Sequence, residues 1–408
     1  MDNNLELLKS INDKYANFES KTLPLCAAEN AMSDFSKLPL ASSIQEKYIM
    51  GGTLSLQVDH NFMESGILFE YYQLLTKLGK ELYGANYTDG RTLTGMNALT
   101  TVLMSAFKIG DKVLLSSEDV GGHGSIPLIC KRLGLDYDFL PYDFEAFDFD
   151  YDQINEMLKK EKISGIVIGL SDIQYTPQIE KIDLQNTILV YDATQTLGLI
   201  AYNPKANPLL TMPEENKILL LGATHKTIPG PSCGLIMARN ISFAEEIDSK
   251  INPVYIRNVQ MHQLLSLIYT LVEFQVYGKQ YIEKIIDNTK TLSKLIEPNF
   301  NLIKKEDTYS LTHQIHFYLD PGKIDNFYQN ASFHSVTLNK RTKKIYNYSG
   351  VRIGTQEITR YGYEADDLRL VSEVLNLLQE NQTKLVNKRI SDILRILTEK
   401  KTVNYCFR

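Results

Sequence analysis

The stretch ILLLGATHKTIPGP, residues 218–231, decides the fold because it is apolar at nearly every position until Gly222. A strand that is apolar on both faces is typical of a mostly parallel sheet covered by helices on both sides. Four other short runs in the chain have this character. They are KVLLSS (112–117), GIVIGLS (165–171), TILVYDAT (187–194) and GLIMAR (234–239). The sequence therefore predicts a large α/β domain.

Helical periodicity surrounds these runs. Residues 60–84 and 95–110 have amphipathic helical patterns, and a long helical stretch follows near 258–290. Beyond it, strands and helices occur in α+β order, which indicates a second, smaller domain. We expect an N-terminal arm over 1–55, a large domain over 56–275 and a small C-terminal α+β domain over 276–408.

Composition narrows the classes of function. The 408 residues are 43% hydrophobic and carry a formal net charge of -6 with no long basic run, so neither a nucleic-acid partner nor an acidic membrane is expected. The N-terminus is polar and acidic, unlike a signal peptide, and no apolar stretch reaches the ~20 residues of a membrane span. A cytoplasmic protein is expected. The cysteines lack CxxC spacing, so we expect buried thiols and no metal site at Cys26, Cys130, Cys233 and Cys406.

Polar residues directly follow several of the apolar runs. Asp192 and Lys226 each lie at such an end, His123 lies in a glycine-rich turn, and Ser171 follows GIVIGL. Taken singly, a strand-end lysine is usually a surface residue and a strand-end aspartate is usually a helix cap. Ligands of open α/β sheets, however, bind beyond the carboxyl ends of the strands, where these residues would meet.

Together these residues match the needs of pyridoxal phosphate. This cofactor requires a lysine for a Schiff base, an acid at its pyridinium nitrogen, a flat stacking group and a phosphate cradle. The stretch TLTGMNAL, residues 92–99, supplies the cradle, because a helix would begin there with free backbone N–H groups. The residues at that helix start are Thr94, Gly95 and Met96.

Several motifs, in order from about residue 25 to 365, resemble those of serine hydroxymethyltransferases. ATHKTIPGP resembles the family's Schiff-base motif, in which a G-P step follows T-H-K-T. The resemblance implies the aspartate aminotransferase-like fold type I architecture and homodimers with active sites at the subunit interface. The other similar segments are CAAENAMS (26–33), QEKYIMGG (45–52), VGGHGS, YDATQTLGLIA and SGVRIGTQEITRYG (349–362).

The resemblance also implies residue roles at the cofactor. Lys226 would form the internal aldimine, Asp192 would hold the pyridinium nitrogen, and His123 would stack on the ring. Ser171 would meet the phenolic oxygen. Further cofactor contacts would come from Thr94, Gly95, Met96, Gln195, Thr224 and His225.

On the substrate side, the resemblance assigns three residues. Arg352 would take the amino-acid carboxylate as a bidentate ion pair, a task that its planar fork suits. Tyr48 would be an active-site tyrosine contributed across the dimer. Glu29, in the segment similar to A-S-E-N, would also contact the substrate.

Departures from the family pattern concentrate on the folate side. Met50 replaces the glutamate of Y-A-E-G, which moves a proton during one-carbon chemistry, and the next family tyrosine falls near Val58. Ser232 replaces the arginine after G-P, and Gln195 replaces the histidine of D-x-A-H. The glycine pair before MH is here Arg257-Asn258.

These departures favour an enzyme that forms an external aldimine with an amino acid but does not use folate. The leading hypothesis is aldolase or transaldolase chemistry on a β-hydroxy amino acid or glycine, with an aldehyde or keto acid as co-substrate. An aminotransferase is the first alternative. A folate-dependent serine hydroxymethyltransferase is another, with Asp59 or His60 replacing the lost carboxylate. A non-catalytic pyridoxal phosphate-binding protein ranks last, because so many cofactor residues are retained.

Overall fold

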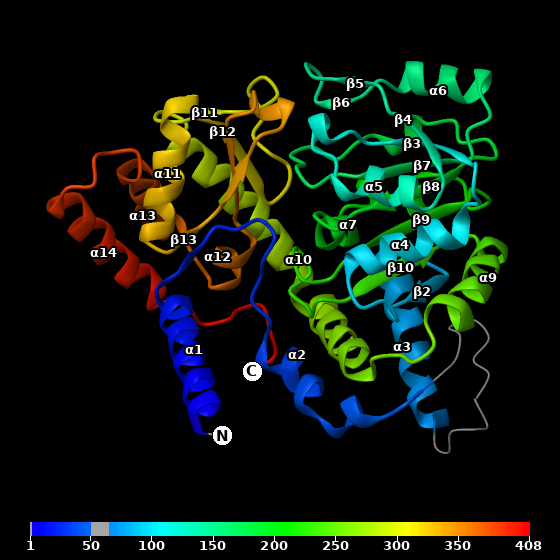
Figure 1. Ribbon diagram of the computed structural model, residues 1–408, viewed down its shortest axis with the longest axis horizontal. Coiled ribbons are helices and arrows are strands. Elements are labelled where there is room, and N and C mark those ends of the chain that lie inside the picture. Colours follow the sequence, from blue (N-terminus) through cyan, green and yellow to red (C-terminus); the bar gives the residue numbers. More distant parts are fainter. Residues whose placement is uncertain (1, 50–64) are drawn as a thin grey trace. The chain divides into compact units, whose positions relative to one another are not determined.

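The computed structural model describes residues 2–49 and 65–408, which form two compact units (Figure 1). The large unit comprises residues 30–283 and 405–408, and the small unit comprises residues up to 29 and 284–404. These units divide the chain differently from the expected segments, because the first 29 residues pack with the C-terminal third.

Within the described residues, the large unit is built on a seven-stranded sheet of order β2-β10-β9-β8-β7-β3-β4. The five strands from β9 to β4 are parallel, and β10 runs antiparallel to β9 and β2. The α/β fold predicted from the apolar runs is confirmed. The strands are β2 (Tyr87–Asp89), β3 (Lys112–Leu115), β4 (Asp136–Phe139), β7 (Gly165–Gly169), β8 (Ile188–Asp192), β9 (Ile218–Ala223) and β10 (Gly234–Ala238).

Burial explains why these apolar runs form strands. Every residue of β7, β9 and β10 is buried, as expected for strands covered on both faces. Apolar side chains of α4 (Gly95–Ala106), α5 (Ser125–Arg132) and α9 (Ile241–Lys250) pack with the sheet in one cluster. Other helices of this unit are α2 (Asp34–Lys37), α3 (Ser65–Tyr83), α6 (Tyr151–Lys160), α7 (Leu197–Tyr202) and α8 (Pro208–Thr211), and β5 (Tyr142–Asp143) pairs with β6 (Asp148–Phe149).

The strand order reverses between β3 and β7. From β3 the chain continues to β4 on one side, and it then returns to β7 on the other side, followed by β8 and β9. Such a topological switch point leaves a crevice at the carboxyl ends of the strands. The segments that follow β3, β7, β8 and β9 therefore lie at one edge of the sheet.

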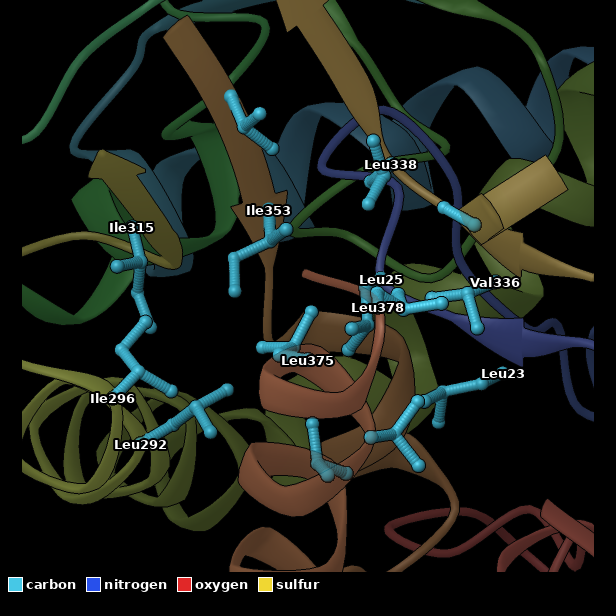
Figure 2. Close-up of a cluster of buried hydrophobic side chains, with 14 of the residues drawn as sticks. Leu23, Leu25, Leu292, Ile296, Ile315, Val336, Leu338, Ile353, Leu375 and Leu378 are labelled. Carbon is cyan, nitrogen blue, oxygen red and sulfur yellow. The ribbon is translucent and has the colours of Figure 1, made fainter. Parts of the chain in front are cut away.

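The small unit has the α+β arrangement that the sequence predicts. Its four-stranded antiparallel sheet, in the described residues, has the order β11-β12-β15-β14. Figure 2 shows the apolar core, in which Leu23, Ile353 and Leu375 come from distant parts of the chain. The strands are β11 (Asn301–Leu302), β12 (Gln314–Tyr318), β14 (Asn339–Arg341) and β15 (Gly350–Gly354), and the helices are α11 (Pro321–Phe333), α12 (Gln356–Arg360), α13 (Ala365–Leu377) and α14 (Lys384–Thr398).

Two features at the beginning of the chain were not expected from the sequence. Residues Asp2–Lys21 form helix α1, and β1 (Leu23–Pro24) pairs in parallel with β13 (Val336–Thr337). Helix α10 (Met261–Ile296) contributes residues to both units. Within the described residues, no helix is both long enough and apolar enough to cross a membrane.

Candidate active site

A pocket of about 280 Å³ lies at the carboxyl edge of the parallel strands in the large unit. The segments after β3, β7, β8 and β9 all contribute to its wall, together with the start of α4. Most of the cofactor residues predicted from the sequence therefore lie together. The lining residues are Thr94, Gly95, Met96, His123, Gly169, Leu170, Ser171, Asp192, Thr194, Gln195, Ala223, His225, Lys226 and Ser232.

Lys226 lies in the loop between β9 and β10, with its side chain in the pocket wall. The side-chain amide of Asn30 donates a hydrogen bond to the backbone carbonyl of Lys226. The next residue, Thr227, donates its hydroxyl to the carbonyl of Gln195 at 3.1 Å and accepts the N–H of Gly198 at 3.0 Å. The main chain around the lysine is therefore anchored.

Asp192 ends β8 and presents a carboxyl group to the pocket. Its Oδ1 accepts the backbone N–H of Thr194 at 3.0 Å. Burial raises the pKa of Asp192, while hydrogen bonds from Thr194 and the charges of Lys226 and His123 act in the opposite direction. A cationic N–H in the pocket would therefore favour the ionised carboxylate, which burial alone disfavours.

His123 is placed by a glycine turn after β3. Gly121 has a φ of +95°, and a Cβ there would lie 2.4 Å from the carbonyl oxygen of Asp172, so only glycine fits. The N–H of His123 donates to Gly169 at 2.9 Å, which ties the turn to β7. The ring Nδ1 accepts the N–H of Ser125 at 3.2 Å, so the neutral ring carries its proton on Nε2.

The start of α4 forms an anion cradle in the pocket wall. The Thr94 hydroxyl caps the helix by accepting the N–H of Asn97 at 3.0 Å. The first N–H groups of a helix have no partner within the helix, so those of Gly95 and Met96 are available to a ligand. A Cβ at position 95 would lie 2.7 Å from the Cβ of Ala223, so glycine permits the close approach of α4 to β9.

His225 lies beside the lysine and lines the same pocket. Burial, assisted by the Lys226 charge, lowers the pKa of His225 to about 4, so the imidazole is neutral at pH 7. Its Nδ1 is buried and has no hydrogen-bond partner among the described residues. A ligand that offers a polar atom to this nitrogen would satisfy it.

Three more predicted cofactor residues have distinct positions. Ser171 and Gln195 line the pocket, Ser171 with its N–H bonded to the carbonyl of Gly121 at 2.8 Å. Thr224 is buried outside the pocket wall, and its hydroxyl donates to the carbonyls of Pro231 at 2.7 Å and Cys233 at 3.2 Å. Thr224 thus braces the lysine loop, and its contact with a cofactor stays a prediction.

The predicted substrate residues lie outside this pocket wall. Tyr48 belongs to the large unit and is 43% exposed, whereas Glu29 and Arg352 belong to the small unit. The Arg352 side chain is buried on β15, where Nε and Nη2 donate to Oδ1 of Asn339 at 3.2 and 2.8 Å. Four residues that the sequence analysis discusses on the folate side lie outside the described residues. They are Met50, Val58, Asp59 and His60.

Sequence reasoning missed two residues that shape the pocket. The Thr194 hydroxyl accepts the N–H of Ala223 at 2.9 Å and so links the ends of β8 and β9. Asn30 holds the main chain of Lys226 from a distant segment. The position of Thr194, two residues after Asp192, was a usable signal, and Asn30 lies in CAAENAMS, the segment that resembles the family's A-S-E-N.

The residues present in the pocket fit pyridoxal phosphate. The carboxyl of Asp192 needs a cationic partner, the helix start needs an anion, and Nδ1 of His225 needs a polar atom. Pyridoxal phosphate offers a pyridinium N–H, a phosphate and further polar atoms, and Lys226 supplies the amine that attaches it. The fold and pocket thus define a pyridoxal phosphate enzyme of the fold type I class.

Comparison with known proteins specifies the family. Residues 2–375 match the family model for serine hydroxymethyltransferase. The chain is 27% identical over 405 residues to the serine hydroxymethyltransferase of Methanocella arvoryzae, which covers 95% of this chain and 92% of the relative. It is 28% identical over 430 residues to that of Pyrococcus furiosus, with 98% and 97% covered. The chain belongs to the serine hydroxymethyltransferase family, and it is a pyridoxal phosphate-dependent enzyme.

A solved structure shares the fold over the whole chain. L-threonine transaldolase from Pseudomonas fluorescens, in the internal aldimine state, matches with a TM-score of 0.90 and 22% sequence identity. The match covers 100% of this chain and 94% of that chain. The fold type I architecture expected from the sequence is confirmed.

Proposed function

We propose that this enzyme breaks or forms the Cα–Cβ bond of a β-hydroxy amino acid by aldolase or transaldolase chemistry, without folate. The observation that carries the proposal is the composition of the pocket wall. Lys226, Asp192 and His123 line it, but so do Ser232 and Gln195, where the family motifs have an arginine and a histidine.

These two replacements change the chemistry available in the pocket. A serine hydroxyl and a glutamine amide form hydrogen bonds, but neither carries a charge near neutral pH. The family glutamate that moves a proton in one-carbon transfer is also replaced, by Met50. Folate-dependent transfer loses these groups, whereas the cofactor residues needed for carbon–carbon cleavage are retained.

Each retained residue then has a defined task. Once bound to an amino acid, pyridoxal phosphate draws electrons from the α-carbon and so permits a bond there to break. Asp192 would keep the ring nitrogen protonated, His123 would offer a flat group to the ring, and the start of α4 would hold the phosphate. Lys226 would attach the cofactor and move a proton at the α-carbon. Arg352 binds the substrate carboxylate with two N–H donors.

The bond changes in the proposed reaction balance without a further reactant. The Cα–Cβ bond breaks, the β-hydroxyl loses its proton and becomes the carbonyl of an aldehyde, and the α-carbon gains a proton to give glycine. In the transaldolase direction, the same α-carbon attacks a second aldehyde instead. An L-threonine transaldolase shares this fold, which supports the compatibility of the architecture with such chemistry.

The proposal includes a homodimer in the cytoplasm. Tyr48 is 43% exposed in the single chain and lies outside the pocket wall, which suits a side chain offered to a second copy. Gel filtration with light scattering tests this part directly, with a mass near twice 46.5 kDa expected.

Folate-dependent serine and glycine interconversion is the second candidate. The names of the relatives from Methanocella arvoryzae and Pyrococcus furiosus favour it. It would require another group to replace the proton transfer lost at Met50.

A product screen by mass spectrometry separates the candidates. Cofactor-loaded protein is incubated with a panel of β-hydroxy amino acids, with and without tetrahydrofolate, and Lys226→Ala serves as the blank. We expect glycine and an aldehyde without folate, and a new β-hydroxy amino acid when a second aldehyde is added. Products that form only with tetrahydrofolate would overturn the proposal in favour of the second candidate, and a keto acid would indicate an aminotransferase.

A further inference from the structure

Residues Tyr405–Arg408, here called the strap, belong to the large unit although residues 284–404 belong to the small one. The Phe407 ring lies edge-on against two aromatic rings, with centroid distances of 5.1 Å to Phe35 and 5.4 Å to Tyr277. The N–H of Phe407 donates to a carboxylate oxygen of Glu273 at 3.2 Å. Side-chain packing and a charge-assisted hydrogen bond thus hold the strap in place.

Glu273 connects the strap to the segment around Ser33. Its side chain lies on α10 and is 1% exposed, and the oxygen that accepts from Phe407 also accepts the Ser33 hydroxyl at 2.9 Å. Burying a carboxyl group is costly unless hydrogen-bond donors satisfy its oxygens, and these two donors do so. The strap and the segment that begins at Asn30 therefore share one buried acceptor.

A second connection runs from the strap to the cofactor lysine. The ring of Tyr405 lies 5.5 Å from that of Tyr281, which is 1% exposed. The hydroxyl of Tyr281 accepts one N–H of the Asn30 amide at 2.8 Å. The same amide nitrogen donates to the backbone carbonyl of Lys226. Asn30 thus contacts both Tyr281, against which the strap residue Tyr405 packs, and the main chain of Lys226.

We infer that the strap braces the cofactor lysine, with Asn30 as the positioning residue that transmits this support. A lysine side chain has four rotatable carbon bonds, so the placement of its amine depends on a fixed main chain. A main chain that is ordered before the cofactor arrives reduces the ordering cost of binding. The left-handed backbone of Tyr405, with a φ of +57°, shows that packing holds the strap in a conformation that L-residues seldom adopt.

The test is a double-mutant cycle on cofactor affinity. Asn30→Ala, Phe407→Ala and the double variant are titrated with pyridoxal phosphate, and visible absorbance reports binding. We expect each single change to weaken binding by at least about fivefold. If the strap acts through Asn30, the loss of cofactor affinity in the double variant will be smaller than the product of the two single losses. We expect the difference to be at least about twofold. Phe333→Ala, which removes a 75% exposed ring in the small unit, is the matched control and should bind normally.

Two further readouts separate positioning from general stability. In loaded Asn30→Ala, the pH midpoint of the visible absorbance change should shift, because the lysine main chain is less constrained. The unfolding temperature of cofactor-free protein is measured for every variant. Unchanged affinity, or strictly multiplicative effects, would overturn the inference, as would a lower unfolding temperature with no change in affinity or absorbance.

A milder change guards against loss of folding. Ser33→Ala removes one donor to Glu273 and the side-chain cap of α2, but it deletes none of the aromatic rings. It should weaken cofactor binding in the same direction as Phe407→Ala but by less, and an affinity equal to that of the unaltered protein would argue against the brace. These titrations contain no substrate, so they remain informative whichever reaction the enzyme catalyses.

Discussion

Arg352 combines a buried position with a neutral partner. Its guanidinium donates two N–H groups to the same oxygen of Asn339, which fixes the plane of the fork. Because Asn339 is an uncharged amide, this contact orients the guanidinium without supplying a counter-charge. A planar cation held in this way suits bidentate binding of a carboxylate. This arrangement supports the substrate role that we propose for Arg352.

Replacing Arg352 by alanine tests this role. The loss of a buried charged partner typically costs at least about 2 kcal/mol, so we expect amino-acid affinity to fall at least about 30-fold. Cofactor affinity should not change. Arg352→Lys retains the charge but loses the planar fork. Its amino-acid affinity should lie between those of the unaltered protein and Arg352→Ala. Spectral titration with amino acids measures the amino-acid affinity, and titration of cofactor-free protein with pyridoxal phosphate measures the cofactor affinity. An unaltered amino-acid affinity in Arg352→Ala would place the carboxylate elsewhere.

At the scale of elements, the phosphate cradle depends on how closely α4 approaches β9. The Cβ of an alanine at position 95 would lie 2.7 Å from the Cβ of Ala223 and 3.0 Å from its backbone nitrogen. The backbone of a central strand cannot yield easily, so α4 would have to move. The same strand leads into Lys226, so the cradle and the lysine share one support.

Gly95→Ala should therefore weaken both folding and cofactor binding. Overpacking of this kind costs about 1–3 kcal/mol of the free energy of unfolding. Gly66→Ala in α3 is a matched control, because a Cβ there meets nothing within 4 Å and alanine favours helix. Urea unfolding and cofactor titration of both variants test the prediction. Equal behaviour of the two would show that the approach of α4 to β9 is not limiting.

At the scale of the whole molecule, Glu357 links stability to pH. Burial, with a further contribution from Glu29, raises the pKa of Glu357 to about 7, against the opposing effects of Lys401 and a hydrogen bond from Tyr361. The folded pKa thus lies above the unfolded value near 4.5. The folded state therefore holds a proton that the unfolded state has released, and stability falls as pH rises from about 4.5 through 7.

Glu357→Gln removes this titration. The variant should match the unaltered protein near pH 4.5, and it should be more stable at pH 8 by up to about 3 kcal/mol. The measurement is the free energy of unfolding in urea, without cofactor, at several pH values. Parallel pH profiles for the two proteins would mean that Glu357 titrates normally in the folded state.

Much of the fold and of the pocket was predictable from the sequence. The doubly apolar runs specify buried parallel strands, and the carboxyl ends of such strands meet at one edge. Asp192 ends its strand, and Ser171 and Lys226 lie shortly after theirs, so the common location of the three residues follows from the local pattern. The anion cradle was equally visible, because a threonine followed by glycine marks a helix start.

Only the tertiary structure decided which distant segments support that pocket. The pairing of β1 with β13, the donation from Asn30 to Lys226 and the return of the strap to the large unit join residues far apart in the sequence. None of these contacts has a periodic or capping signal, since they depend on packing after the sheet has formed. The sequence by itself determined the strands and the chemistry at their ends, because those follow from local periodicity. The supports of the lysine depend on long-range contacts, so they became visible only in the folded chain.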